Sequence, residues 1–147
     1  MVKEGLLILS NTMSKGKIIK RAALIKKVIA SKGYTNPLAE MLGERPNPFK
    51  GMCYVASALL YELFDGEGMT LYRKKDYSGQ YHWWIKTDDG DTIDITAEQY
   101  ECEGRKAPSS SYDGAEIAKL MWFPSYKKRI AVLRQELEDY MKENDYE

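Results

Sequence analysis

The sequence predicts an α+β domain in which helices come first and an antiparallel sheet follows. Apolar residues recur at helical spacing over residues 15–31 and again over residues 53–64. Between residues 69 and 95 the period changes to that of strands, and turn-forming residues separate the segments. Runs of helices followed by runs of strands are typical of α+β folds.

Three helices are predicted in the first half of the chain. The first covers residues 15–31, and Gly33 is expected to end it. Pro37 is expected to open a short second helix that runs through Leu42. A loop with two prolines then leads to the third helix, over residues 53–64.

Three strands are predicted in the middle of the chain. They cover Met69–Arg73, the aromatic-rich segment Gln80–Thr87 and Asp91–Ile95, with a turn at residues 88–90 before the last. Residues 96–99 read as a capped helical turn.

The last third of the chain begins with a polar segment, residues 104–113, which we expect to be a loop. Residues 114–121 are predicted to be helical, and Pro124 is expected to interrupt the chain. A long charged helix is predicted over residues 125–143.

Length and composition restrict the class of protein. A chain of 147 residues fits one domain, residues 1–147, with a core of its own. Lys and Arg together number 22, as do Asp and Glu, and this balance argues against a nucleic-acid-binding surface. The longest apolar run, residues 5–9, is too short to cross a membrane or to form a signal peptide, so we expect a cytoplasmic protein.

No cofactor is predicted. The two cysteines, Cys53 and Cys102, are expected to be reduced thiols in that compartment. With a single histidine and no close pair of ligands, no metal site is expected. The sequence does not predict the oligomeric state.

Cys53, His82 and Asp94 stand in an order that suggests chemistry. Cys53 opens a predicted helix, His82 lies in a strand and Asp94 in the next strand. A cysteine attacks carbonyl groups as the thiolate, which a helix N-terminus and a nearby imidazolium both favour. A carboxylate can hold the imidazole in the required tautomer. Taken singly, the cysteine and the histidine are more typical of a core, and the aspartate of a helix cap.

The turn before Asp94 decides whether the last two residues can meet. A two-residue turn at Asp89-Gly90 would place His82 and Asp94 on opposite faces of the hairpin. A three-residue loop, with Gly90 in the left-handed conformation, sets Trp84 opposite Asp94 and puts His82 diagonally across on the same face. Both turns fit the sequence, and only the second supports a triad.

Three further residues are candidates for the walls of the site. Trp84 shares the predicted face of His82, and Tyr54 follows the cysteine directly. Asn47, six residues before Cys53, is a weak candidate for the second donor of an oxyanion hole, beside the Cys53 N–H. A loop asparagine is equally typical of a turn.

These segments resemble small proteins of bacteria and bacteriophages that have a papain-like or transglutaminase-like core. The resemblance covers roughly residues 50–130 and rests on these positions: Gly51, Cys53–Ser57, His82-Trp83, Asp94, Thr96-Ala97, Gln99-Tyr100, Phe123, Ser125 and Lys127–Arg129. It implies a papain-like fold, a Cys53–His82–Asp94 triad and a bacterial or phage-infected host cell. Ile95 departs from the pattern, in which a proline follows the aspartate.

The favoured function is a cysteine-dependent acyl-transfer enzyme that acts on an amide through a thioester on Cys53. Its substrate would be a protein or peptide, and hydrolysis would make it a protease, an isopeptidase or a deamidase. Transfer to an amine would make it a transglutaminase or an acyltransferase. The alternative is a non-catalytic phage accessory protein that binds a host or virion protein.

Overall fold

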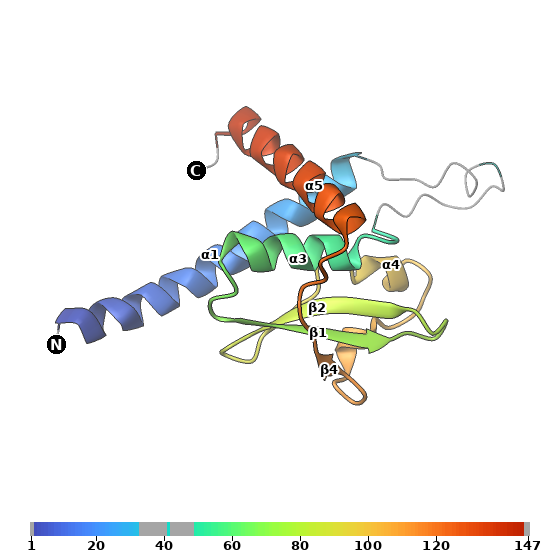
Figure 1. Ribbon diagram of the computed structural model, residues 1–147, viewed down its shortest axis with the longest axis horizontal. Helices are drawn as coiled ribbons and strands as arrows, with labels where there is room; N and C mark the ends of the chain where they lie inside the picture. Colours follow the sequence, from blue (N-terminus) through green and yellow to red (C-terminus); the bar gives the residue numbers. More distant parts are fainter. Residues whose placement is uncertain (1, 33–40, 42–48, 146–147) are drawn as a thin grey trace.

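The computed structural model describes residues 2–32, 41 and 49–145. Within these residues the chain forms four α-helices and one four-stranded antiparallel sheet of order β3-β2-β1-β4, so the α+β prediction is confirmed (Figure 1). In chain order the elements are α1 (Val2–Lys32), α3 (Cys53–Leu63), β1 (Met69–Lys75), β2 (Tyr81–Thr87), β3 (Thr92–Ile93), α4 (Glu98–Glu101), the 3₁₀ turn η1 (Pro108–Ser110), β4 (Glu116–Ile117) and α5 (Pro124–Glu143).

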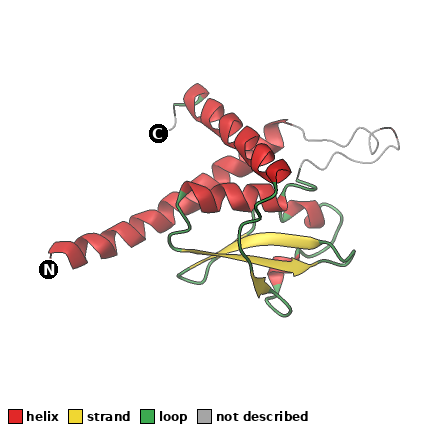
Figure 2. Ribbon diagram, in the orientation of Figure 1, coloured by secondary structure: helices red, strands yellow, loops and turns green. Residues whose placement is uncertain are grey.

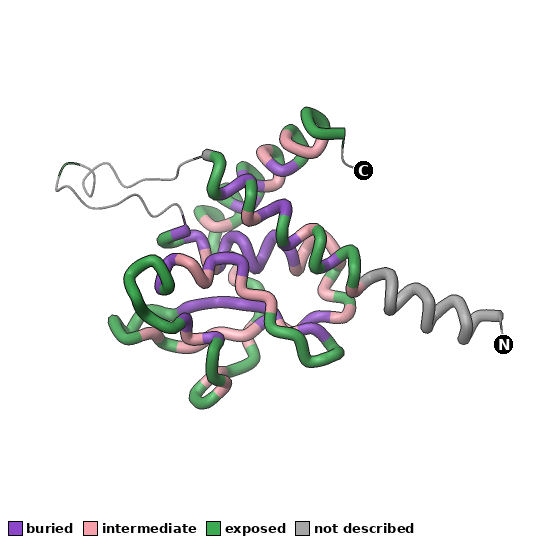
Figure 3. The backbone as a smooth tube through the Cα atoms, turned by 180° about the vertical axis from the view of Figure 1, so that it is seen from behind, coloured by how far each residue is buried: buried purple, intermediate pink, exposed green. Residues whose placement is uncertain are grey.

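Helix α3 is the centre of the fold. It contacts β1 and β2 on one side and α1 and α5 on the other, so that α1, α3 and α5 all lie on one face of the sheet (Figure 2). Every residue from Tyr54 to Leu60 is buried, which an eleven-residue helix reaches only when it is covered on all sides. Figure 3 shows the buried residues concentrated in α3 and β2.

Alternation along β2 sends its side chains to two different environments. Trp83 and Ile85 join the core that α3 shares with the sheet. His82 and Trp84 point to the other face, where the chain from residue 94 to residue 112 covers them. Both faces of the strand are therefore buried, one against the core below α3 and the other under the chain that follows β3.

The loop between β2 and β3 is the three-residue loop that a triad requires. Lys86 pairs with Thr92, the Thr87 N–H donates to the Asp91 carbonyl (2.8 Å), and Gly90 has φ +92°. This register places Asp94, the residue after β3, on the face that carries His82. The prediction of the three-residue loop is confirmed.

Two of the predicted helices are not found among the described residues. Residues 114–121 are not helical: Glu116–Ile117 form β4, which pairs with β1 through Tyr72 and Arg73. A free sheet edge attracts a short extended segment, and the Arg73–Glu116 ion pair (2.6 Å) joins the two strands. The helix predicted over Pro37–Leu42 lies outside the described residues, apart from Met41.

The first helix is longer than predicted, because α1 begins at Val2 instead of residue 15. None of the helices in the described part of the chain combines the length and the apolar character that crossing a bilayer demands. The cytoplasmic location stays a prediction.

Candidate active site

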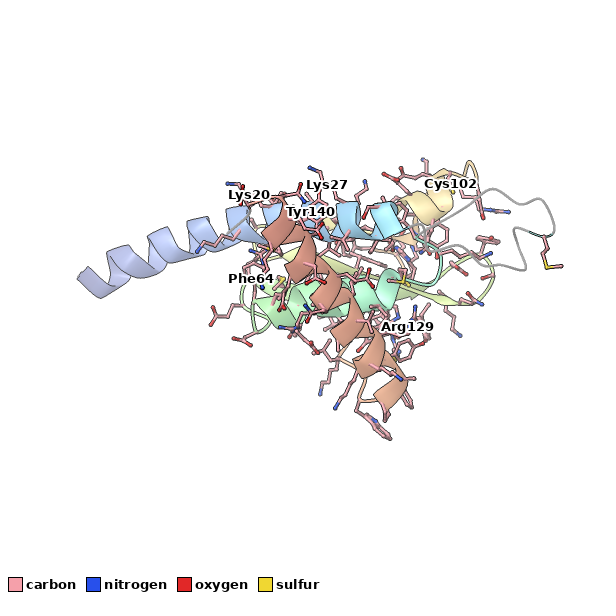
Figure 4. The ribbon with its side chains drawn as sticks, turned by 90° about the horizontal axis from the view of Figure 1, so that it is seen from above. Lys20, Lys27, Phe64, Cys102, Arg129 and Tyr140 are labelled. Carbon is pink, nitrogen blue, oxygen red and sulfur yellow. The ribbon has the colours of Figure 1, made fainter. Side chains whose placement is uncertain are left out.

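Cys53 is the first residue of α3, and its side chain is half-buried. The turn before it is held in place by α5. Gly51 has φ +79°, a conformation that a glycine adopts without strain, and its carbonyl accepts a hydrogen bond of 2.8 Å from Arg129 Nη2. Figure 4 labels Arg129 on α5, beside the start of α3. In the first turn of a helix the N–H groups have no partner within the helix, so the Cys53 N–H is a donor beside the sulfur.

His82 and Asp94 form a buried pair. His82 Nε2 lies 2.7 Å from Asp94 Oδ2, and neither side chain has more than a trace of exposed surface. The same carboxylate oxygen accepts a hydrogen bond of 2.5 Å from the Ser109 hydroxyl in η1. A carboxylate in this position holds the ring in the tautomer that carries a proton on Nε2.

The second ring nitrogen is held by Gln99 in α4. Its amide nitrogen, Nε2, lies 2.8 Å from His82 Nδ1, and the side chain is buried. Helix α4 is joined to α1 by the ion pair between Glu98 and Lys26 (2.6 Å). Both nitrogens of the imidazole are therefore hydrogen-bonded, Nε2 to Asp94 and Nδ1 to Gln99.

The pKa of His82 is raised to about 9. Burial is the largest single influence and would lower the pKa, because a charged ring loses its hydration. Hydrogen bonds to Asp94 and to Cys53, and the negative charges of both partners, together outweigh burial. The ring therefore interacts with Cys53 as well as with Asp94.

The thiol itself donates to the Tyr81 carbonyl oxygen, with Sγ and O 3.8 Å apart. Tyr81 is the first residue of β2, directly before His82. The start of α3 therefore lies next to the start of β2, beside the residue that precedes His82.

A cavity of about 690 Å³ opens at the thiol. Cys53 and Gln99 both line it, whereas His82 has no exposed surface. The rest of its lining combines aromatic rings, charged side chains and the loop between β1 and β2: Lys50, Gly51, Tyr54, Arg73, Asp76, Tyr77, Ser78, Gly79, Gln80, Tyr81, Trp83, Tyr100, Glu103, Met121 and Tyr126.

The loop at the cavity is organised by Asp76. Its Oδ1 accepts from the backbone and hydroxyl of Ser78 and from the Gln80 N–H, and its Oδ2 accepts from the Tyr100 hydroxyl (2.8 Å). Burial would raise the pKa of this carboxyl, but these hydrogen bonds hold it below its usual value. The Tyr100 ring in turn lies edge-on to His82, with centroids 4.9 Å apart.

The residues predicted to wall the site have different positions. Tyr54 lines the cavity, packs against Trp83 and exchanges hydrogen bonds with the Met121 backbone. Trp84 is fully buried behind the ring of His82, with centroids 6.1 Å apart, so it cannot wall the cavity and that expectation is wrong. Asn47 lies outside the described residues.

The sequence gives little sign of three residues that shape the site. Gln99 ends the predicted helical turn of residues 96–99, and nothing in the sequence links it to His82. Ser109 belongs to a polar segment expected to be a loop, and nothing in the sequence links it to Asp94. Arg129 is one of three successive basic residues of the predicted long helix, and nothing in the sequence links it to the turn before Cys53, whose Gly51 carbonyl it bonds. The residues that the structure describes contain no group of three His, Cys, Asp or Glu side chains suited to a metal ion.

Comparison with known proteins corrects the expected relationship. A family described as "YunG protein" matches residues 35–142, which is well over half of the chain. No curated protein and no solved structure matches this chain. The resemblance to papain-like or transglutaminase-like proteins is therefore wrong as a statement of family. The resemblance rests on short, separated segments only, and these do not determine the family.

Proposed function

Since this chain belongs to the YunG family, a name that states no reaction, we propose a function from the site itself: a cysteine-dependent acyl-transfer enzyme that acts on an amide. Cys53 is the nucleophile, His82 the base and Asp94 the residue that orients the ring. The proposal includes a papain-like arrangement, in which the cysteine begins a helix that packs on an antiparallel sheet with the histidine and the aspartate. This describes the architecture and implies no relationship to the papain family.

One observation carries the proposal. His82 is held by a buried carboxylate at 2.7 Å, and the pKa of the same ring is raised by that carboxylate and, next, by the cysteine that begins α3. A base with a raised pKa, held in one tautomer beside a thiol, is the arrangement that activates a sulfur nucleophile. The helix N-terminus adds to this, since its N–H groups and dipole favour a negative sulfur.

The reaction proceeds in two stages. The thiol proton moves from Sγ to His82 Nδ1, and Sγ attacks the carbonyl carbon of the amide. The Cys53 N–H is a donor for the oxyanion that forms. When the tetrahedral intermediate collapses, the C–N bond breaks and the ring proton moves to the leaving nitrogen, which gives an amine and a thioester. Water then releases an acid, or an amine acceptor takes the acyl group.

The cavity supports a protein or peptide substrate. Its volume of about 690 Å³ accommodates a few side chains, and its aromatic walls provide apolar contacts beside the thiol. The same walls carry charges of both signs, Lys50 and Arg73 against Asp76 and Glu103, so the cavity does not favour a strongly charged ligand.

Acetylation by p-nitrophenyl acetate tests the proposal without a known substrate. Intact-mass and peptide mass spectrometry should find a transient acetyl group on Cys53 and none on Cys102, which is exposed and so serves as an internal control. Cys53→Ala should abolish the acetyl group, and His82→Ala should slow its formation. Equal acetylation of both cysteines, unaffected by His82→Ala, would contradict an activated nucleophile.

The second candidate is a non-catalytic accessory protein that binds a host or virion partner. Exposed aromatic residues favour it: Trp122 and Phe123 are stacked on each other and are 73% and 47% exposed. Unreactive Cys53 in the acetylation test, together with a binding defect in Trp122→Ala, would favour this candidate over the enzyme.

A further inference from the structure

We propose that Gln99 is a positioning residue that holds His82 Nδ1 in the resting site, so that a ligand in the cavity activates Cys53 by displacing the Gln99 amide. This inference rests on the proposed function. It starts from the contact of 2.8 Å between Gln99 Nε2 and His82 Nδ1, the nitrogen that must accept the thiol proton.

With the Gln99 amide nitrogen facing Nδ1, the hydrogen bonds around the ring fit the cysteine–histidine pair before the thiol proton reaches that nitrogen. The thiol donates to the Tyr81 carbonyl, the Gln99 amide N–H donates to Nδ1, and the Nε2–H donates to Asp94. In each bond a donor meets an acceptor only if Sγ is protonated and Nδ1 is not. The Gln99 hydrogen bond therefore opposes protonation of Nδ1, which the hydrogen bonds and charges of Asp94 and Cys53 favour.

Proton transfer cannot leave this arrangement unchanged. Once Nδ1 carries a proton, the amide N–H of Gln99 and the ring N–H are two donors that face each other. The amide must then rotate to present its oxygen, or move away so that Nδ1–H turns to the thiolate. The orientation of Gln99 is thereby coupled to the protonation state of His82.

Gln99 is also placed to sense a ligand. It lines the cavity together with Cys53, whereas His82 has no surface there. A substrate amide that approaches Sγ brings its own donor and acceptor groups next to the Gln99 side chain. If the Gln99 amide bonds the substrate amide instead of the ring, Nδ1 is free to accept the thiol proton. It can later donate that proton to the leaving nitrogen.

Two substitutions should change the reactivity of Cys53 in opposite directions. Gln99→Met keeps the length of the side chain but removes the donor to Nδ1, so the ring accepts the thiol proton more readily. Alkylation of Cys53 by iodoacetamide at pH 6.5 should become about 2- to 10-fold faster, the effect of one hydrogen bond. Gln99→Leu provides a second apolar variant if the first does not fold.

Gln99→Glu should act in the opposite sense. Its carboxylate accepts the Nδ1–H bond permanently and adds a negative charge beside the sulfur, which disfavours the thiolate. Alkylation should slow by roughly tenfold, which is the effect of a shift of one pKa unit. Gln135→Met is the control, because Gln135 lies on α5 and bonds Asp139 away from the site.

The comparison separates the two proposals. Faster alkylation in Gln99→Met and slower alkylation in Gln99→Glu support the positioning role. Changes in the same direction, or no change, overturn that role, since a purely structural glutamine would affect both variants alike. If Cys53 of the unaltered protein reacts no faster than Cys102, the proposed function itself fails.

Discussion

His82 is the residue whose surroundings are least like those of a typical core histidine. Buried histidines are usually neutral, because burial disfavours the charged ring. Here two potential anions, Asp94 and Cys53, both raise the pKa of the ring, to about 9 in spite of burial. A purely structural site has no need for a second anion on that ring, which is why we connect the arrangement with chemistry.

The first prediction concerns the reactivity of Cys53. In a Cys102→Ser background, His82→Ala should slow alkylation by iodoacetamide at pH 6.5 by roughly tenfold or more, since an ordinary thiol is almost fully protonated there. Asp94→Ala should slow it less, because it removes only the support of the imidazolium. Equal rates in all three proteins would mean that the thiolate receives no help from the pair.

The second prediction concerns stability and pH. The folded pKa of His82, about 9, lies above the ordinary value of 6.5, so protonation of this ring favours the folded state. That contribution is complete below about pH 6.5 and is lost as the pH rises through 9. Urea unfolding from pH 6.5 to 9.5 should show a steeper loss of stability in the unaltered protein than in His82→Gln. Parallel curves would show that the ring titrates alike in both states.

The positions of Cys53, His82 and Asp94 in the fold could be predicted from the sequence because they depend on short segments with strong local preferences. Cys53 follows a turn and opens an apolar helix, and His82 and Asp94 flank a turn of defined length. Gln99, Ser109 and Arg129 could not be predicted in the same way. Their partners lie 15 to 78 residues away in the chain, and only the packing of α4, η1 and α5 brings them to the site.

At the scale of elements, the loop between β2 and β3 determines which face Asp94 occupies. The loop closes over three residues because Gly90 adopts φ +92°, where side chains other than glycine are strained. Residues 114–121 show the opposite case. Their pattern was compatible with a helix, and pairing with the edge of β1 determines their conformation instead.

The third prediction tests the loop. Gly90→Ala should destabilise the protein by about 1–2 kcal/mol through its backbone conformation alone, since no atom lies within 4 Å of the added Cβ. Gly16→Ala is the control, because Gly16 lies in α1 with equally open space and no positive φ. It should stabilise the protein by about 0.5–1 kcal/mol. Urea unfolding measures both, and a similar sign for the two would refute the account of the loop.

At the scale of the whole molecule, the packing of α1 and α5 on α3 determines where the first residue of α3 lies. It lies between the sheet and the layer of α1 and α5, and its first residue is Cys53. Leu133 and Leu137 of α5 are part of the same core. The position of the thiol relative to β2 therefore depends on helices that contribute no proposed catalytic group.

The fourth prediction measures this dependence. Leu133→Ala should lower the free energy of unfolding by about 2–5 kcal/mol, the usual cost of an emptied leucine site. Val132→Ala, at the next position of α5 but 51% exposed, should change it by less than about 0.5 kcal/mol. Comparable losses in the two variants would show that α5 is not packed on α3 as described.

The most direct test of the central claim is a ¹⁵N NMR titration of His82, the only histidine in the chain, in the unaltered protein and in Cys53→Ala. The account predicts that the ring titrates near pH 9 in the unaltered protein, and that its pKa falls in the variant, because the hydrogen bond and charge of Cys53 both raise it. Circular dichroism should show the same fold for both proteins. An identical pKa of His82 in the two would mean that thiol and ring do not interact, and would contradict the proposed cysteine–histidine pair.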